Sequence, residues 1–207
     1  MTKFKDFIYA ILAGACIALG GVVYLSVENK VVGAFLFSTG LFMVLTLGYN
    51  LFIGKVGYVF LNDKRTYLPF LGIVYAGNFV GSVIVAELIR LTRVGAKVQE
   101  AATVLVTTKL TDSYLSLFIL GLFCNFFVVN AVHQYKNNPH EFGKYMGIFM
   151  SIMVFILAGF EHSIADMFYF QMARAWSLHT VICLLVITLG NIVGGVIIPS
   201  LAAMKDK

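Results

Sequence analysis

The chain has 207 residues, of which 60% are hydrophobic and only 12% are charged, about half the charged share of an average soluble protein. So few charges exclude a water-soluble globular fold, which needs a polar surface. The net charge of +5 is spread over the ends of apolar stretches and forms no basic tract, which argues against a nucleic-acid-binding protein.

Six long uncharged runs follow one another along the chain and predict six transmembrane helices, since a helix needs about 20 apolar residues to cross a bilayer. The runs are continuously apolar and do not alternate with a two-residue period, which excludes a membrane β-barrel. We therefore expect an all-α membrane protein with a single transmembrane domain over 1–207. The runs cover 7–27, 31–54, 66–86, 113–135, 145–160 and 175–204.

The distribution of Lys and Arg predicts the orientation of the protein in the membrane. Six crossings place both termini on one side, and that side carries more positive residues than the other. Positive residues favour the cytoplasm, so we expect cytoplasmic termini in a prokaryotic inner or cell membrane. The terminal side would hold Lys3, Lys5, Lys55, Lys64, Arg65, Lys136, Lys144, Lys205 and Lys207, and the opposite side Lys30, Arg90, Arg93, Lys97, Lys109 and Arg174.

The third and sixth runs share a nine-residue pattern that indicates an internal repeat. Residues 77–85 read GNFVGSVIV and residues 190–198 read GNIVGGVII, which agree at six of nine positions. Chance similarity between two glycine-rich packing helices is the alternative. If 1–89 and 114–203 are two three-helix copies, the odd helix number inverts the second copy. Such proteins place their pathway at the repeat interface, where helices break.

The middle helix of each half is interrupted by polar and flexible residues. Gly48–Gly57 packs three glycines and a lysine into the second run, and Gly159-Phe-Glu-His-Ser163 interrupts the fifth. We expect both helices to be broken. Ser163-Ile-Ala-Asp166 has the spacing of a capping box, which would open a second half-helix whose amino terminus favours anions.

At these residues the sequence resembles the formate/nitrite transporter family, pentameric anion channels whose aquaporin-like protomer has six helices. The resemblance covers essentially the whole chain. It rests on Leu51-Phe52 followed by Gly54, Asn78-Phe-Val-Gly81, Phe123-Cys-Asn125, Gly159-Phe-Glu-His-Ser163 and Asn191-Ile-Val-Gly-Gly195.

The resemblance implies roles for individual residues. His162 matches the central pore histidine, Lys109 the positively charged vestibule residue, and Asn125 the asparagine of the fourth helix. Ile53 stands where the family usually has a threonine that faces the histidine, and most of the family's amino-terminal amphipathic helix is missing. The family's two hydrophobic constrictions would be built from Phe37, Leu41, Leu51, Phe52, Val128 and Phe155.

The polar residues of the breaks also have interpretations of their own. An ionisable group in mid-membrane costs at least ~2.5–3.5 kcal/mol unless it reaches a cavity or a partner, so His162 is a functional candidate, with a satisfied structural histidine as the alternative. On a helix Glu161 would point about 100° away from His162, which favours a structural role accepting backbone N–H bonds. Asn78 and Asn191 would bond the carbonyls that the breaks leave free, or else contact substrate.

We therefore expect a channel or proton-coupled transporter for a small monovalent anion of a weak acid such as formate, nitrite or hydrosulfide. His162 would exchange the proton that neutralises the anion. Substrate, protons and lipid would be its partners, and a homopentamer follows from the resemblance alone. The alternative is an aquaporin-like channel for a neutral solute, although paired Asn-Pro-Ala motifs are absent. No enzyme, metal or cofactor motif is found, so none of these is expected.

Overall fold

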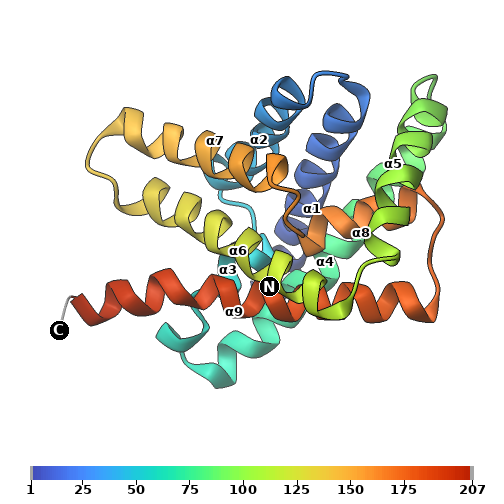
Figure 1. Cartoon of the computed structure of the whole chain (residues 1–207). Helices are drawn as coiled ribbons and strands as arrows, with labels where there is room; N and C mark the ends of the chain where they lie inside the picture. The colour runs from blue at the N-terminus through green and yellow to red at the C-terminus, as the bar shows by residue number, and fades with distance from the viewer. Residues whose placement is uncertain (1, 206–207) are drawn as a thin grey trace.

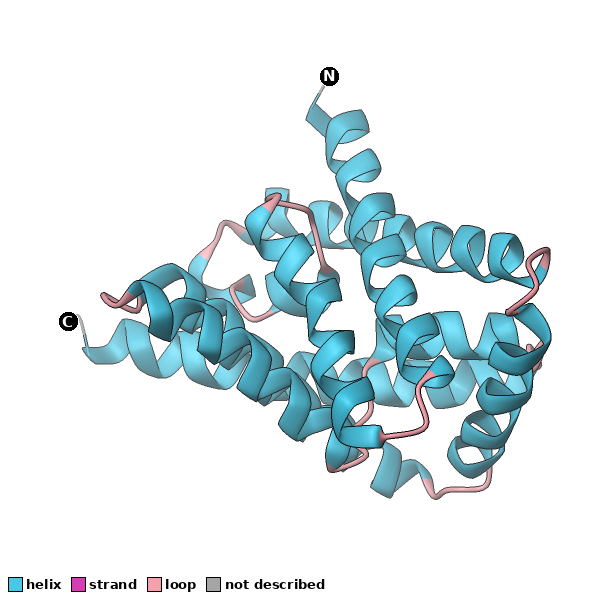
Figure 2. Cartoon of the chain, turned by 90° about the horizontal axis from the view of Figure 1, so that it is seen from above, coloured by secondary structure: helices cyan, strands magenta, loops and turns pink. Residues whose placement is uncertain are grey.

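The computed structural model describes residues 2–205, and Lys207 of the charge count lies outside this range. Throughout the described residues the chain is helical, with no strand, and short loops join the helices (Figure 2). The elements are α1 (Thr2–Ser26), α2 (Lys30–Thr46), α3 (Phe52–Val56), the 3-10 turn η1 (Val59–Leu61), α4 (Lys64–Arg90), α5 (Gly95–Leu110), α6 (Tyr114–Asn137), α7 (Glu141–Leu157), α8 (Ser163–Met172) and α9 (Leu178–Lys205).

Four helices, α1, α4, α6 and α9, are long and apolar enough to cross a membrane by length and composition. Each of the other two crossings is divided between two shorter helices, α2 with α3 and α7 with α8. The expected all-α membrane fold with broken second and fifth helices is therefore confirmed.

One helix, α5, was not expected from the sequence. It connects the two halves and packs against α8 and α1, beside α8 in Figure 1. The helix has only 16 residues and carries Lys97, Glu100 and Lys109, so it does not have the long uncharged run of a membrane helix. Its last turn brings Lys109 next to the interruption that precedes α8.

The two halves pack by the same close helix contacts. The pairs α1 with α4 and α6 with α9 are the most extensive in the protein, and Figure 1 shows α6 and α9 running side by side. A Cβ at Gly81 would lie 2.0 Å from the carbonyl oxygen of Ile11, and a Cβ at Gly194 would lie 1.9 Å from that of Leu122. The glycines of the repeated pattern are therefore the points where the backbones touch.

The two breaks have the same backbone geometry. Gly48 and Gly159 adopt left-handed φ angles of 71° and 74°, which a residue with a Cβ rarely adopts. One residue later, the N–H of Tyr49 donates to Val44 O at 2.9 Å and the N–H of Phe160 donates to Phe155 O at 3.0 Å. Each glycine thus ends one half-helix and turns the chain toward the next, α3 or α8.

Candidate functional site

The first break is held in place by Asn78 of α4. Its Nδ2 donates to the carbonyl oxygens of Ala10 at 2.7 Å and Asn50 at 2.9 Å, while its Oδ1 accepts the N–H of Phe52 at 2.8 Å. The side chain is fully buried. It therefore satisfies backbone groups on both sides of the interruption, where lipid could not.

Asn191 of α9 does the same at the second break. Its Nδ2 donates to Gly121 O at 2.7 Å and Glu161 O at 2.8 Å, and its Oδ1 accepts the N–H of Ser163 at 3.0 Å. The three partners are the repeat equivalents of Ala10, Asn50 and Phe52. Both N–H groups of each amide are used in these bonds, which leaves neither amide a donor for a substrate.

His162 is the N-cap residue of α8. Its φ of −109° and ψ of 100° are extended, and its Nδ1 accepts the N–H of Ala165 at 3.1 Å. The expected capping box is therefore wrong: Ser163 is the first helical residue, its hydroxyl has no partner among the described residues, and the imidazole nitrogen takes the capping place. In the neutral ring this bond assigns the proton to Nε2.

Beside the histidine lies a buried cluster of Lys109, Glu161 and Asp166. The ammonium of Lys109 pairs with Glu161 Oε2 and lies 3.0 Å from Asp166 Oδ1. The three side chains are only 10%, 6% and 1% exposed. Two carboxylates therefore share one cation in a region of low dielectric constant, where such pairing is needed to keep charges buried.

Two expectations for this cluster were wrong. Glu161 bonds the side chain of Lys109 and not backbone N–H groups, and it lines the same cavity as His162. The 100° separation does not apply because residues 158–162 are not helical. Asp166 was missed as a site residue because its spacing from Ser163 looked like a cap.

Two cavities approach each other inside the protein. The histidine cavity, of about 210 Å³, is lined by Tyr24, Phe37, Lys109, Phe155, Glu161, His162, Asp166 and Tyr169 among others. The lysine cavity, of about 140 Å³, is lined by Leu41, Leu51, Lys55, Tyr135 and Lys136 among others. The first is lined by Tyr24 near the end of α1, and the second by Tyr135 and Lys136 near the end of α6. Since α1 and α6 are the first and fourth crossings and run in opposite directions, the two cavities lie toward opposite sides of the membrane.

The apolar residues between the cavities form a thin barrier. Phe37 lines the histidine cavity and Leu41 the lysine cavity, although they lie only one turn apart on α2, about 6 Å along the axis. The rings of Phe37 and Phe155 meet edge to face at 6.3 Å, and Phe155 lies 5.7 Å from the ring of His162. Leu51 covers the lysine side.

The remaining residues expected at the site are buried but line neither cavity. Phe52 packs edge to face on Tyr75 of α4 with ring centres 4.8 Å apart. Asn125 donates from Nδ2 to Asn191 O at 2.7 Å, which joins α6 to α9. Ile53 and Val128 are enclosed in the core, at 0% and 1% exposure. Of the expected site residues, the two cavities are lined by Phe37, Leu41, Leu51, Lys109, Phe155, Glu161 and His162, while these four lie around them.

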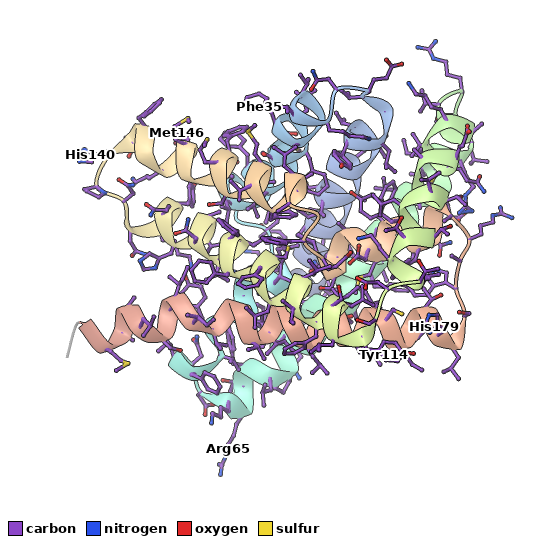
Figure 3. All side chains as sticks on the ribbon, viewed as in Figure 1. Phe35, Arg65, Tyr114, His140, Met146 and His179 are labelled. Atoms are coloured by element: carbon purple, nitrogen blue, oxygen red, sulfur yellow. The ribbon has the colours of Figure 1, made fainter. Side chains whose placement is uncertain are left out.

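The other histidines lie away from the cavities. His140 is in the turn between α6 and α7, and His179 lies beside Tyr114 near the start of α9, where the Tyr114 hydroxyl is 3.1 Å from its Nδ1 (Figure 3). Over residues 2–205, no group of three His, Cys, Asp or Glu side chains is arranged to hold a metal ion.

The sequence profile described as formate/nitrite transporter matches residues 1–204. The chain belongs to the formate/nitrite transporter family. Two relatives and one solved structure show how similar this chain is to other proteins in sequence and in fold. The formate channel FocA of Haemophilus influenzae is 31% identical over 94% of this chain and 84% of its own length. The nitrite transporter NirC of Salmonella typhimurium is 29% identical over 90% and 77%.

A solved structure described as a pentameric formate channel with formate bound has the same fold as this chain. It superposes with a TM-score of 0.81 at 26% sequence identity, covering 98% of this chain and 96% of the other. The resemblance suggested by the motifs is therefore confirmed, as is the six-helix plan with inverted repeats. These relatives are channels or transporters.

Proposed function

We propose that the protein is a channel or proton-coupled transporter for small monovalent anions of weak acids, with formate, nitrite and hydrosulfide as the candidate substrates. The observation that carries this proposal is the pair of opposed cavities separated by one helical turn of apolar side chains, with His162 at the edge of that turn. The names of the formate and nitrite relatives support it. No observation favours the neutral-solute alternative.

The barrier explains why a weak acid suits this pore. Moving a bare anion through the apolar turn between Phe37 and Leu41 would strip its hydration at high cost, whereas the neutral acid crosses with much less desolvation. When a proton from the histidine cavity adds to Nδ1, the ring gives up its bond with Ala165 N–H, and the imidazolium can then pass one proton to an anion in the cavity and return to the neutral form. The acid then crosses and releases its proton into the lysine cavity.

Lys109 sets the charge of the histidine cavity in this scheme. Its ammonium is offset by Glu161 and Asp166, so the net charge that the cavity presents to an anion depends on all three groups. We retain Lys109 as the residue that makes anion entry possible from this side, because without it two carboxylates would repel the substrate.

The setting of the protein completes the proposal. We infer a homopentamer in a prokaryotic cell membrane, supported by the pentameric structural relative, with lipid around the apolar outer helices. Both termini would face the cytoplasm, supported by the excess of Lys and Arg on that side. Transport without covalent chemistry fits the relatives, which are channels and transporters.

The test is a flux assay in proteoliposomes with radiolabelled formate, nitrite and hydrosulfide, and with water permeation as the control. We expect anion uptake that rises as the external pH is lowered, because protons are consumed on entry. In His162→Phe this pH dependence should be lost between pH 5 and 8, while His140→Phe, in an exposed turn, should behave as the parent. Water flux without anion flux would overturn the proposal, and unaltered pH dependence in His162→Phe would remove the histidine from it.

A further inference from the structure

The two cavities are related by the internal repeat, residue by residue. Seven pairs of lining residues are separated by the same 111 positions, and so are the two tyrosines, one from α1 and one from α6, that the cavities receive. Their walls are therefore alike in backbone, and they differ in side-chain chemistry. The pairs are Val44 and Phe155, Leu45 and Ile156, Gly48 and Gly159, Tyr49 and Phe160, Leu51 and His162, Gly54 and Ala165, Lys55 and Asp166, and, for the tyrosines, Tyr135 and Tyr24.

The charges of the two cavities differ. In the histidine cavity the single lysine is paired with two carboxylates. The lysine cavity carries Lys55 from α3 and Lys136 from the last turn of α6, and no acidic side chain is part of its described lining. At the position where the repeat puts Asp166 in one cavity, it puts Lys55 in the other.

The two lysines of the lysine cavity are not neutralised by neighbours. In the part of the chain that the structure describes, neither forms an ion pair within 4.0 Å. Asp6 of α1 acts on Lys55 electrostatically but does not line the cavity. The ammonium of Lys136 lies 4.2 Å from the ring centre of Tyr58, a cation–π contact that brings no opposite charge to it.

The position of Lys55 is fixed by its backbone. Its carbonyl oxygen accepts the hydroxyl of Tyr67 at 2.8 Å, and its N–H donates to Leu51 O at 3.0 Å, which secure α3 against the start of α4. The side chain therefore leaves a rigid half-helix toward the cavity. Leu41 and Leu51 line the same cavity and belong to the apolar barrier.

We propose that the lysine cavity is an anion-binding site, in which Lys55 and Lys136 hold a small monovalent carboxylate or oxyanion in front of the barrier. This inference rests on the proposed function and deepens it. The pore is then asymmetric: the lysine cavity binds the anion by uncompensated positive charge, and the histidine cavity exchanges its proton. Two cations converging on a cavity of this size suit a one-charge ligand of a few atoms.

The experiment measures how the rate of formate efflux depends on formate concentration at the lysine-cavity side, using Lys55→Gln, Lys136→Gln and the double variant in proteoliposomes. Lys64→Gln is the matched control, because Lys64 is exposed at the same end and lines neither cavity. Each lost charge should raise the half-saturating concentration about threefold at low ionic strength, and the effect should shrink in high salt.

Charge must be separated from structure. Lys55→Arg and Lys136→Arg should retain a half-saturating concentration close to that of the parent, and size-exclusion chromatography should show the same oligomer for all variants. If the glutamine variants match Lys64→Gln in active vesicles, the lysine site is overturned while the proposed function stands. If the parent carries no anion, it is the proposed function that fails.

Discussion

Lys109 shows how a single side chain can hold a buried site together. Its ammonium is the cation in reach of both Glu161 and Asp166, and all three groups are almost fully enclosed. Removing one partner of a buried ion pair costs about 3–5 kcal/mol because the remaining charge has no counterpart. Lys109, for which we propose a role in anion entry, therefore also stabilises the broken helix through these ion pairs.

We expect Lys109→Met to lower the unfolding temperature of the purified protein at neutral pH. The loss is expected because two buried carboxylates no longer share a cation. Lys97→Met, on the exposed side of the same helix, is the control. Equal unfolding temperatures for the two variants at pH 7 would contradict the ion-pair cluster.

Ile53 of the half-helix α3 is the position at which a contact between α3 and His162 can be tested. The residue is fully buried and lines neither cavity. By the resemblance described above, it takes the place of a threonine. We predict that Ile53→Thr supplies a hydroxyl to the imidazole of His162. A net hydrogen bond of about 0.5–1.5 kcal/mol would change an opening equilibrium several-fold.

The measurement is conductance or flux against pH for Ile53→Thr, with Ile53→Val as a control of the same branched shape but without the hydroxyl. We expect the pH midpoint to move in the threonine variant alone. If threonine and valine behave alike, residue 53 does not face His162.

Asp166 illustrates which site residues sequence reasoning can find. Spacing rules assume a regular helix, and they led to a capping box at Ser163 and to a separation of Glu161 from His162. Both failed because the chain between α7 and α8 is extended around His162, with Gly159 in a left-handed conformation. The position of a residue in a break depends on contacts from distant elements, here α5 and α9, which spacing does not contain.

At the scale of elements, the two half-helices depend on the asparagines of neighbouring long helices. Asn78→Ala or Asn191→Ala removes three hydrogen bonds and leaves buried N–H and C=O groups unpaired, each at a cost of about 1–3 kcal/mol.

We expect either variant to unfold at a clearly lower temperature, with loss of flux even where the oligomer still forms. Asn137→Ala is the control, since its amide also donates to a backbone carbonyl but is exposed. Differential scanning fluorimetry in detergent measures the effect. Unfolding of Asn78→Ala at the temperature of the control would show that the break is held by other contacts.

The elements differ in how much of them can be read from the sequence. The four long helices and the two breaks follow from uncharged runs and from Gly48 and Gly159, because hydrophobic length and left-handed glycines are local properties. Helix α5 does not follow, since its charged residue Lys109 meets its partners, in α8 and the preceding break, only in the folded protein. The cavities, likewise, arise from packing between the halves.

The orientation of the whole molecule in the membrane can be measured by labelling its loops. Asn62 before α4 and Thr92 after it are both exposed and lie at opposite ends of that helix. The natural cysteines, Cys16, Cys124 and Cys183, are buried.

In intact cells a membrane-impermeant thiol reagent should label Thr92→Cys, and it should label Asn62→Cys only after the membrane is opened. This is the pattern for cytoplasmic termini, in keeping with the positive-inside rule. The unmodified protein is the control for background labelling. Reversed labelling would place the termini outside and would make the lysine cavity the external entrance.

The thin barrier between Phe37 and Leu41 also has an electrical consequence. With water in both cavities, the membrane voltage would fall mainly across the turn of α2 between Phe37 and Leu41, which is about 6 Å long or roughly a fifth of the usual 30 Å of hydrocarbon. The electrical energy of a bare anion changes by about 2.3 kcal/mol per 100 mV of membrane potential as it crosses this turn, whereas that of a neutral acid does not change. The current that accompanies transport therefore reports which of the two species passes between the rings.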